Sequence, residues 1–271
     1  MTRLSMSRSK NRARGVELVC FDAMFTLFKP AGGDRERLIA NVYRQVGGLR
    51  LAVSDETLRR QIVRARAKHR DLRHDREYWQ TVNCEVFTTL RDHMLRRGSL
   101  IERALEVNRR IMTDVRLYEP DLEIVRVVRK LRRARVRVVI ASNQESRSLD
   151  ILLEHFGLTE LFDAVHTSQS LGTRKPFKSF WQKLLRLEDR RPGGTVHVGN
   201  SLNADIGAAR LKVRTLIWDP CGRSARILGG LGRNKYVHPD LTDEQFQTLI
   251  KGGYVSLVST AREAERKIFG R

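Results

Sequence analysis

The chain has 271 residues, of which 41% are hydrophobic, and it carries a formal net charge of +21. This length suits one well-buried domain with an insertion, or two small domains, because single cores usually comprise ~100–200 residues. No apolar run approaches the ~18–20 residues of a membrane-spanning helix, so we expect no membrane insertion. The cysteines Cys20, Cys84 and Cys221 are widely separated, lack metal-binding spacing and suit a reducing compartment.

The positive charge is carried mostly by arginine, with 41 arginines against 11 lysines. The planar guanidinium group suits phosphate recognition, and a large positive field attracts polyanions. A GC-rich coding sequence would also favour arginine over lysine, but it would not reduce the number of acidic residues. We therefore expect an RNA or ribonucleoprotein partner, and the alternative is that the composition reflects drift in the lineage.

Residues 1–15 are predicted to form a basic N-terminal arm or a targeting segment. The chain has no acidic residue before Glu17, and its first residues include Arg3, Arg8, Arg12 and Arg14. Such a composition is typical of a mitochondrial transit peptide, and equally of a basic arm that lies along RNA. We expect a mitochondrial protein, with a cytoplasmic location as the alternative, and we assign these four arginines to nucleic-acid contacts.

The next elements are a short buried strand over residues 16–21 and a hinge-like turn over residues 29–33. Residues 34–116 show apolar side chains at helical spacing, which predicts an all-helical insertion. One face of this insertion carries a row of arginines with few acidic residues four positions away, so we expect it to contact RNA; the alternative is an ordinary solvated helix face. The row consists of Arg59, Arg60, Arg64, Arg66, Arg70 and Arg73.

From residue 117 onward, short apolar strands alternate with helices. This alternation predicts an α/β fold whose parallel sheet is covered on both faces and binds ligands at the carboxyl ends of its strands. The core would comprise residues 16–33 and 117–271, with residues 34–116 inserted. The predicted strands cover residues 136–141, 162–166, 195–198 and 214–218, and the predicted helices cover residues 122–133, 148–156, 177–187, 203–211, 243–250 and 256–269.

Polar residues follow four of the predicted strands at the points where the strands end. Asp22 and Thr26 follow the first strand, and Ser142 follows the second. Lys175 lies in the loop after the third strand, and Asp205 follows the fourth. Their order resembles the haloacid dehalogenase (HAD) superfamily, whose members are mostly phosphohydrolases with a helical cap inserted after the first strand. The resemblance covers residues 16–220 and implies a parallel-sheet Rossmann-like HAD core with an inserted all-helical cap.

The resemblance implies a role for each of these residues. Asp22 matches the nucleophile that forms an aspartyl intermediate, and Thr26 matches the residue that steadies the turn after it. Ser142 matches the hydroxyl that binds a phosphoryl oxygen, and Lys175 matches the cation that offsets the charge of nucleophile and phosphoryl group. Asp205 matches an acid of the metal-binding loop. The implied metal site consists of Asp22, Asn200 and Asp205.

Two departures affect the parts of the family site that support phosphatase chemistry. Met24 stands where family phosphatases have a second acid, which protonates the leaving group and activates water with a gain of ~10²–10⁴ in rate. Asn200 stands where the metal loop has an aspartate, and a neutral amide binds Mg²⁺ less well than a carboxylate. We therefore expect no cofactor, with Mg²⁺ bound only if the ancestral site is retained.

These departures favour a pseudoenzyme with a degraded phosphohydrolase site. We expect it to serve as a basic component of an organellar ribosome or of ribosome assembly, in contact with RNA and neighbouring proteins. The alternative is an active HAD-family hydrolase with Asp22 as nucleophile, either dehalogenase-like or a small-molecule phosphatase. The dehalogenases of this superfamily also lack the second acid, work without a metal, and begin with the same Phe21-Asp22-Ala23 sequence.

Overall fold

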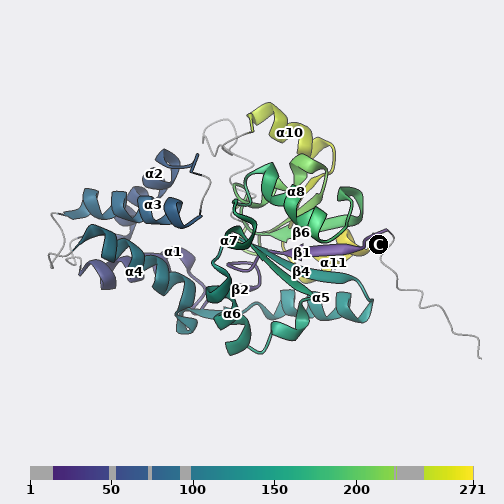
Figure 1. Ribbon diagram of the computed structural model, residues 1–271, viewed down its shortest axis with the longest axis horizontal. Helices are drawn as coiled ribbons and strands as arrows, with labels where there is room; N and C mark the ends of the chain where they lie inside the picture. Colours follow the sequence, from purple (N-terminus) through teal and green to yellow (C-terminus); the bar gives the residue numbers. More distant parts are fainter. Residues whose placement is uncertain are drawn as a thin grey trace, which may run out of the picture.

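The computed structural model describes residues 15–48, 53–72, 75–91, 99–222, 224 and 241–270. A β-sheet with helices on both faces forms one part of the molecule, and a group of four helices lies to one side of it (Figure 1). None of the helices in the described ranges has the length and apolar content needed to cross a bilayer. The predicted contacts of Arg3, Arg8, Arg12, Arg14 and Arg73 lie outside the described residues.

The main sheet has six strands in the order β5-β4-β1-β6-β7-β8, and every neighbouring pair is parallel. Because the central strand β1 has later strands on both sides, its carboxyl end lies where the direction of chain winding reverses, which is where such folds bind ligands. The prediction of a parallel Rossmann-like core is confirmed. The strands are β1 (Leu18–Phe21), β4 (Arg137–Ser142), β5 (Ala164–Thr167), β6 (Thr195–Gly199), β7 (Arg214–Trp218) and β8 (Val255–Val258).

Both faces of the sheet are buried because the strands are apolar on both sides. On β4, Val138 and Ile140 pack into the cluster that contains α5, α6 and α11, whereas Val139 and Ala141 pack against α8. Helix α10 covers β7 on the side of α8 (Figure 1). These helices are α5 (Leu122–Arg133), α6 (Ser146–His155), α8 (Lys178–Leu187), α10 (Asp243–Lys251) and α11 (Ala261–Phe269), with the short α7 (Ser168–Leu171) after β5.

Helix α5 shows how local sequence sets these boundaries. Asp121 caps its N-terminus by accepting hydrogen bonds from the backbone N–H groups of Glu123 and Ile124. Basic residues fill its last turn, where they complement the helix dipole. Its buried apolar stripe faces the sheet. The chain also forms short 3₁₀ turns: η2 (Val115–Leu117), η3 (Thr159–Leu161), η4 (Pro192–Gly194), η5 (Asp205–Gly207) and η6 (Ala209–Leu211).

The four helices beside the sheet, called the cap below, lie between the short strands β2 (Phe28–Pro30) and β3 (Tyr118–Pro120). These strands pair antiparallel, with Pro30 opposite Tyr118, so the chain enters and leaves the cap through one two-stranded ribbon. A hydrogen bond from the Tyr43 hydroxyl to Asn83 joins α1 to α3 inside the cap. The cap helices are α1 (Arg35–Gly47), α2 (Asp55–Lys68), α3 (Asp75–Leu90) and α4 (Leu100–Thr113).

Three predicted elements differ from the structure. Residues 256–269 were expected to form one helix, but β8 ends at Val258 and α11 begins at Ala261 after the cap Thr260. Residues 203–211 form the 3₁₀ turns η5 and η6 rather than a helix, and Lys212 ends them in the left-handed conformation. The predicted turn at residues 29–33 is in part the strand β2, whose partner β3 is distant in sequence.

Candidate active site

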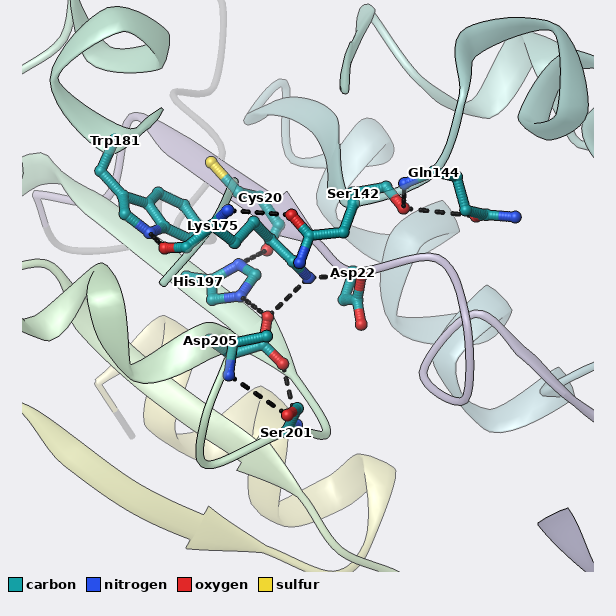
Figure 2. Close-up of polar contacts among 11 residues, drawn as sticks. Cys20, Asp22, Ser142, Gln144, Lys175, Trp181, His197, Ser201 and Asp205 are labelled. Atoms are coloured by element: carbon teal, nitrogen blue, oxygen red, sulfur yellow. Dashed lines mark hydrogen bonds and ion pairs between the residues drawn. The ribbon is translucent and has the colours of Figure 1, made fainter. Parts of the chain in front are cut away.

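Four buried side chains with ionisable groups form a chain of contacts at the carboxyl ends of β1 and β6 (Figure 2). The Nζ atom of Lys175 lies 2.5 Å from Asp22 Oδ1 and 2.7 Å from Asp205 Oδ1. The Nε2 atom of His197 lies 2.8 Å from the same Asp205 oxygen. Lys175, Asp205 and His197 are at most 1% exposed, and Asp22 is 6% exposed. The structure therefore brings Asp22, Lys175 and Asp205 together as the sequence indicated.

Lys175 is held at its backbone as well as at its side chain. Its backbone N–H donates to Asn143 Oδ1 over 2.9 Å, and its carbonyl oxygen accepts a hydrogen bond of 2.7 Å from Trp181 Nε1. Trp181 also packs on the ring of His197, with centroids 4.5 Å apart. These contacts fix the direction in which the ammonium group approaches Asp22.

Asp205 is positioned by close backbone packing. Its Oδ2 accepts a hydrogen bond from the Ser201 backbone N–H over 2.8 Å. A Cβ atom on Gly199 would lie 2.2 Å from the Asp205 carboxyl carbon, so the last residue of β6 must lack a side chain. Burial raises the pKa of Asp205, but Lys175 and His197 outweigh it and hold that pKa well below its usual range. Asp205 is therefore a permanent carboxylate that orients Lys175.

Asp22 has the opposite pKa shift. Burial raises the pKa of Asp22 to about 6, the charge of Lys175 opposes that rise, and the nearby Asp205 carboxylate adds to it. Two carboxylates share one ammonium group, and Asp22 is the one that opens onto the cavity. Above about pH 6, Asp22 presents a carboxylate oxygen that can act as a nucleophile.

Thr26 and Ser142 lie near this centre without contacting it. Thr26 is fully buried in the turn after Asp22, and its hydroxyl has no hydrogen-bond partner among the described residues. Ser142 ends β4 and bonds to Gln144, accepting from its backbone N–H at 3.2 Å and donating to its Oε1 at 3.3 Å. Ser142 lines the same cavity as Asp22.

The cavity has a volume of about 260 Å³ and lies between the cap and the strand ends. Within the described ranges, Asp22 is its one acidic lining residue, whereas five cationic residues line it. Met24, in the position of the family's second acid, is also part of the wall and is 9% exposed. The cationic residues are Arg35, Arg66, Arg70, Arg174 and Lys175.

The arginine row of the cap divides into two sets. Arg59 and Arg60 both pair with Glu56, at 2.5 Å and 3.2 Å, so a single acid partly neutralises these two arginines. Arg64 is exposed on α2, whereas Arg66 and Arg70 line the cavity. The row is thus not one outward face, and the assignment of Arg59, Arg60 and Arg64 to RNA stays a prediction.

The residues of the implied magnesium site do not fit the ion. Asp205 was expected to be a ligand, but hydrogen bonds from Lys175, His197 and the Ser201 backbone use both its oxygens. Asn200 contributes only a neutral amide, and in the described part of the chain no group of three Asp, Glu, His or Cys side chains is placed so that it could hold a metal ion. Mg²⁺ needs near-octahedral oxygen coordination, for which Asp22 alone is a poor anchor.

Sequence reasoning missed His197. It lies within the strand β6, where an isolated histidine in an apolar run resembles a core residue. The alternation of side chains along the strand could have indicated it. Thr195, His197 and Gly199 share one side of the strand, and Gly199 leads to the polar loop.

Comparison with known proteins agrees with this geometry. Residues 16–211 match the family model of haloacid dehalogenase-like hydrolases. A ribulose-1,5-bisphosphate 5-phosphatase of Halopiger xanaduensis is 34% identical over 90 residues, which cover 33% of this chain and 38% of the relative. The alignment thus spans less than two-fifths of that relative's own length.

Two solved structures share the fold at low identity. YfnB of Bacillus subtilis, whose structure contains bound magnesium, has a TM-score of 0.62 at 16% identity, covering 93% of this chain and 98% of YfnB. The L-2-haloacid dehalogenase of Xanthobacter autotrophicus has a TM-score of 0.60 at 18% identity, covering 94% of this chain and 99% of the dehalogenase. At these identities the likeness concerns the fold alone.

Proposed function

Because the chain belongs to the haloacid dehalogenase-like hydrolase family, we propose that it is a hydrolase in which Asp22 attacks a small organic anion and expels a leaving group that needs no proton. The observation that carries this proposal is the pairing of Asp22 with Lys175 at 2.5 Å in a cavity where Met24 stands in place of a second acid. The nucleophile and its cation are present, whereas the proton donor for a poor leaving group is absent.

A carbon–halogen bond meets this requirement, because halide departs as a stable anion. The Asp22 carboxylate oxygen attacks the carbon that bears the halogen, a carbon–oxygen ester bond forms, and the halide leaves with the bonding electrons. Water then attacks the ester carbonyl, which releases the alcohol and leaves Asp22 as the acid. With a pKa of about 6, that acid gives its proton to solvent at neutral pH and restores the carboxylate.

The presence of Met24 in place of an acid is therefore as consistent with a different leaving group as with a loss of catalytic activity. The expectation of a pseudoenzyme rested on Met24 and Asn200, which stand in place of two acids of family phosphatases. The scheme above needs neither of those acids. No step of it passes through Mg²⁺. A phosphoryl compound whose leaving group is already a good anion, such as an acyl phosphate, is a second candidate, favoured by the sequence match to a phosphatase.

The test measures halide release from 2-bromopropanoate by the purified protein in the presence of a chelator. We expect turnover that Mg²⁺ does not increase, and a loss of at least about 10³-fold in Asp22→Asn, which removes the nucleophile. Asp150→Asn is the matched control, because Asp150 is exposed on α6 and is not part of the cavity lining. Phosphate release from acetyl phosphate without halide release would select the second candidate. Turnover of neither substrate by the unaltered protein would contradict the proposal.

A further inference from the structure

The cavity beside Asp22 is larger and more aromatic than a two- or three-carbon acid requires. Its volume of about 260 Å³ is many times the ~10–15 Å³ that one buried water molecule needs on the same measure. Aromatic side chains line it from both parts of the molecule: Phe25 from the turn after β1, and Tyr78 and Trp79 from α3. A ligand that fills this space must present apolar area to these rings.

Each of these three rings has an arginine stacked on it. The guanidinium carbon lies 4.0 Å from the ring centroid in the Arg35–Phe25 pair, 5.3 Å in Arg66–Trp79 and 3.7 Å in Arg174–Tyr78. Stacking holds a guanidinium in place by cation–π attraction and leaves it positively charged. With Asp22 as the one acidic lining residue in the described ranges, the field inside the cavity favours an anion.

The backbone at Phe25 has a strained conformation, and its ring lines the cavity. Its φ angle is +62°, in the left-handed region that glycine adopts readily and that is unfavourable for a residue with a side chain. The ring contacts Arg35 on one side and packs edge-on against Tyr118 at 6.4 Å. Strain of this kind persists where the surroundings hold the residue, and here it places an aromatic wall three residues after the nucleophile.

Two hydrogen-bond donors in the cavity wall lack acceptors among the described residues. The Nε2 atom of Gln144 is buried, the residue as a whole is 2% exposed, and its Oε1 already accepts from Ser142. Figure 2 shows this amide beyond Ser142, on the side away from Lys175. The Nε1 atom of Trp79 is buried and unpartnered on the cap side. A buried donor without an acceptor is costly, so both atoms point to acceptor oxygens on a ligand.

We propose that this cavity binds an organic acid that has an apolar group the size of an aromatic ring and a hydrogen-bond acceptor for Gln144 and Trp79. This inference rests on the proposed hydrolase function. Phe25, Tyr78 and Trp79 contact the apolar body, and the stacked arginines attract the acid group. Ligand binding thereby supplies acceptors for both orphan donors.

Binding is measured first, by calorimetry on Asp22→Asn with 3-phenyllactate and with lactate as probes. These acids are the products that hydrolysis of the corresponding 2-bromo acids would give. We expect 3-phenyllactate to bind at least about tenfold more tightly, because its ring buries apolar surface that lactate lacks. Equal or weaker binding of 3-phenyllactate overturns the inference.

Variants then locate the contacts. Phe25→Gly removes the ring at a position whose φ suits glycine, so we expect a folded protein in which the preference for 3-phenyllactate falls at least about fivefold. Trp79→Phe keeps an aromatic ring and Gln144→Leu keeps a side chain of similar size, and each deletes the unpartnered donor. Each should weaken 3-phenyllactate binding by about fivefold or more. Arg64→Met, on the exposed side of α2, is the control that should leave binding unchanged. Unaltered binding in all three cavity variants overturns the assignment.

Turnover separates this inference from the function on which it rests. The unaltered protein is assayed on 2-bromo-3-phenylpropanoate and 2-bromopropanoate. Halide release from both compounds without preference for the phenyl compound would support the hydrolase function and overturn the proposed ligand of the cavity. Tight 3-phenyllactate binding without halide release from either compound supports the assignment and contradicts the hydrolase.

Discussion

At the scale of single residues, Asp22 decides whether the site can react. Its carboxylate needs to be ionised to attack, and burial works against ionisation while Lys175 works for it. The balance leaves a pKa of about 6, higher than that of an ordinary aspartate. A nucleophile with this pKa is charged at neutral pH and less stabilised by solvent than an exposed carboxylate.

The first prediction at this scale concerns pH. As the pH falls through about 6, Asp22 takes up a proton and loses its nucleophilicity, so kcat/KM should fall about tenfold per pH unit on the acid side. The profile of kcat/KM reports groups of the free enzyme, and it should be flat between about pH 7 and 8. An acid limb with its midpoint near 4 would contradict the raised pKa of Asp22.

Met24 and Asn200 carry the second prediction. Restoring carboxylates in Met24→Asp/Asn200→Asp supplies a proton donor and a metal ligand next to Asp22. We expect a gain of Mg²⁺-dependent hydrolysis of p-nitrophenyl phosphate and a weaker rate on halogenated acids. Adding Asp22→Asn to this pair should abolish the gained activity. A double variant that binds Mg²⁺ by calorimetry and shows no phosphatase activity would contradict the roles given to these positions.

Most residues of the site could be predicted from the sequence, because each follows an apolar strand and parallel strands end at one edge. That argument places Asp22, Ser142, Lys175 and Asp205 together. It does not tell which oxygens remain available. The family resemblance implied that Asp205 is a metal ligand, but Lys175 and His197 bind its carboxylate. Hydrogen-bond partners from different strands cannot be derived from spacing alone.

At the scale of elements, the close fit between η5 and the loop at Lys175 supports the site. A Cβ atom on Gly207 would lie 2.3 Å from the carbonyl oxygen of Lys175 and 2.8 Å from that of Pro176. Backbone atoms cannot move as easily as a side-chain tip, so the third residue of η5 must be glycine if the loop is to keep its place.

We therefore expect Gly207→Ala to lower the free energy of unfolding by about 1–3 kcal/mol and to reduce kcat by displacing Lys175. Gly193→Ala is the matched control, since Gly193 is exposed and a Cβ there meets nothing within 4 Å. Urea unfolding and halide-release assays measure the two effects. Equal stability of the two variants would show that the loop gives way without cost.

Helices and central strands were predictable because their apolar periodicity is long and their caps are explicit. The predicted limits of α5 and β7 match the structure to the residue. The edge strand β8 was not predictable in the same way, because Val255 and Val258 fit a helical face as well as a short strand and only pairing with β7 decides between them. Likewise β2 depends on β3, which lies beyond the whole cap in sequence.

At the scale of the whole molecule, the net charge of +21 exceeds what the cavity uses. Arg59, Arg60 and Arg64 are exposed on α2 and lie outside the cavity lining, whereas Arg70 is exposed and also lines the cavity. If the expected RNA contact exists, replacing Arg59, Arg60 and Arg64 by Gln should weaken it and reduce the slope of log K against log salt by about 0.7 per lost contact with single-stranded RNA. Halide release should not change. Replacement of Arg66 and Arg70 should instead reduce halide release and leave RNA binding unchanged. An equal loss of RNA binding in the two groups of variants would contradict the division of the row. No measurable RNA binding by the unaltered protein would contradict the expectation of an RNA contact.

The ribbon of β2 and β3 has a consequence for the design of such chains. In topological terms, the cap replaces the turn of a β-hairpin, since Pro30 and Tyr118 face each other where that turn would be. Joining the two residues by a short turn would give a minimal chain that keeps the sheet, Asp22 and Lys175 but lacks the cap that covers the cavity. The covalent connection between cap and core is therefore confined to this one hairpin. A different helical unit grafted there would alter what reaches the nucleophile, and it would have to replace the apolar contacts that the cap makes with the core.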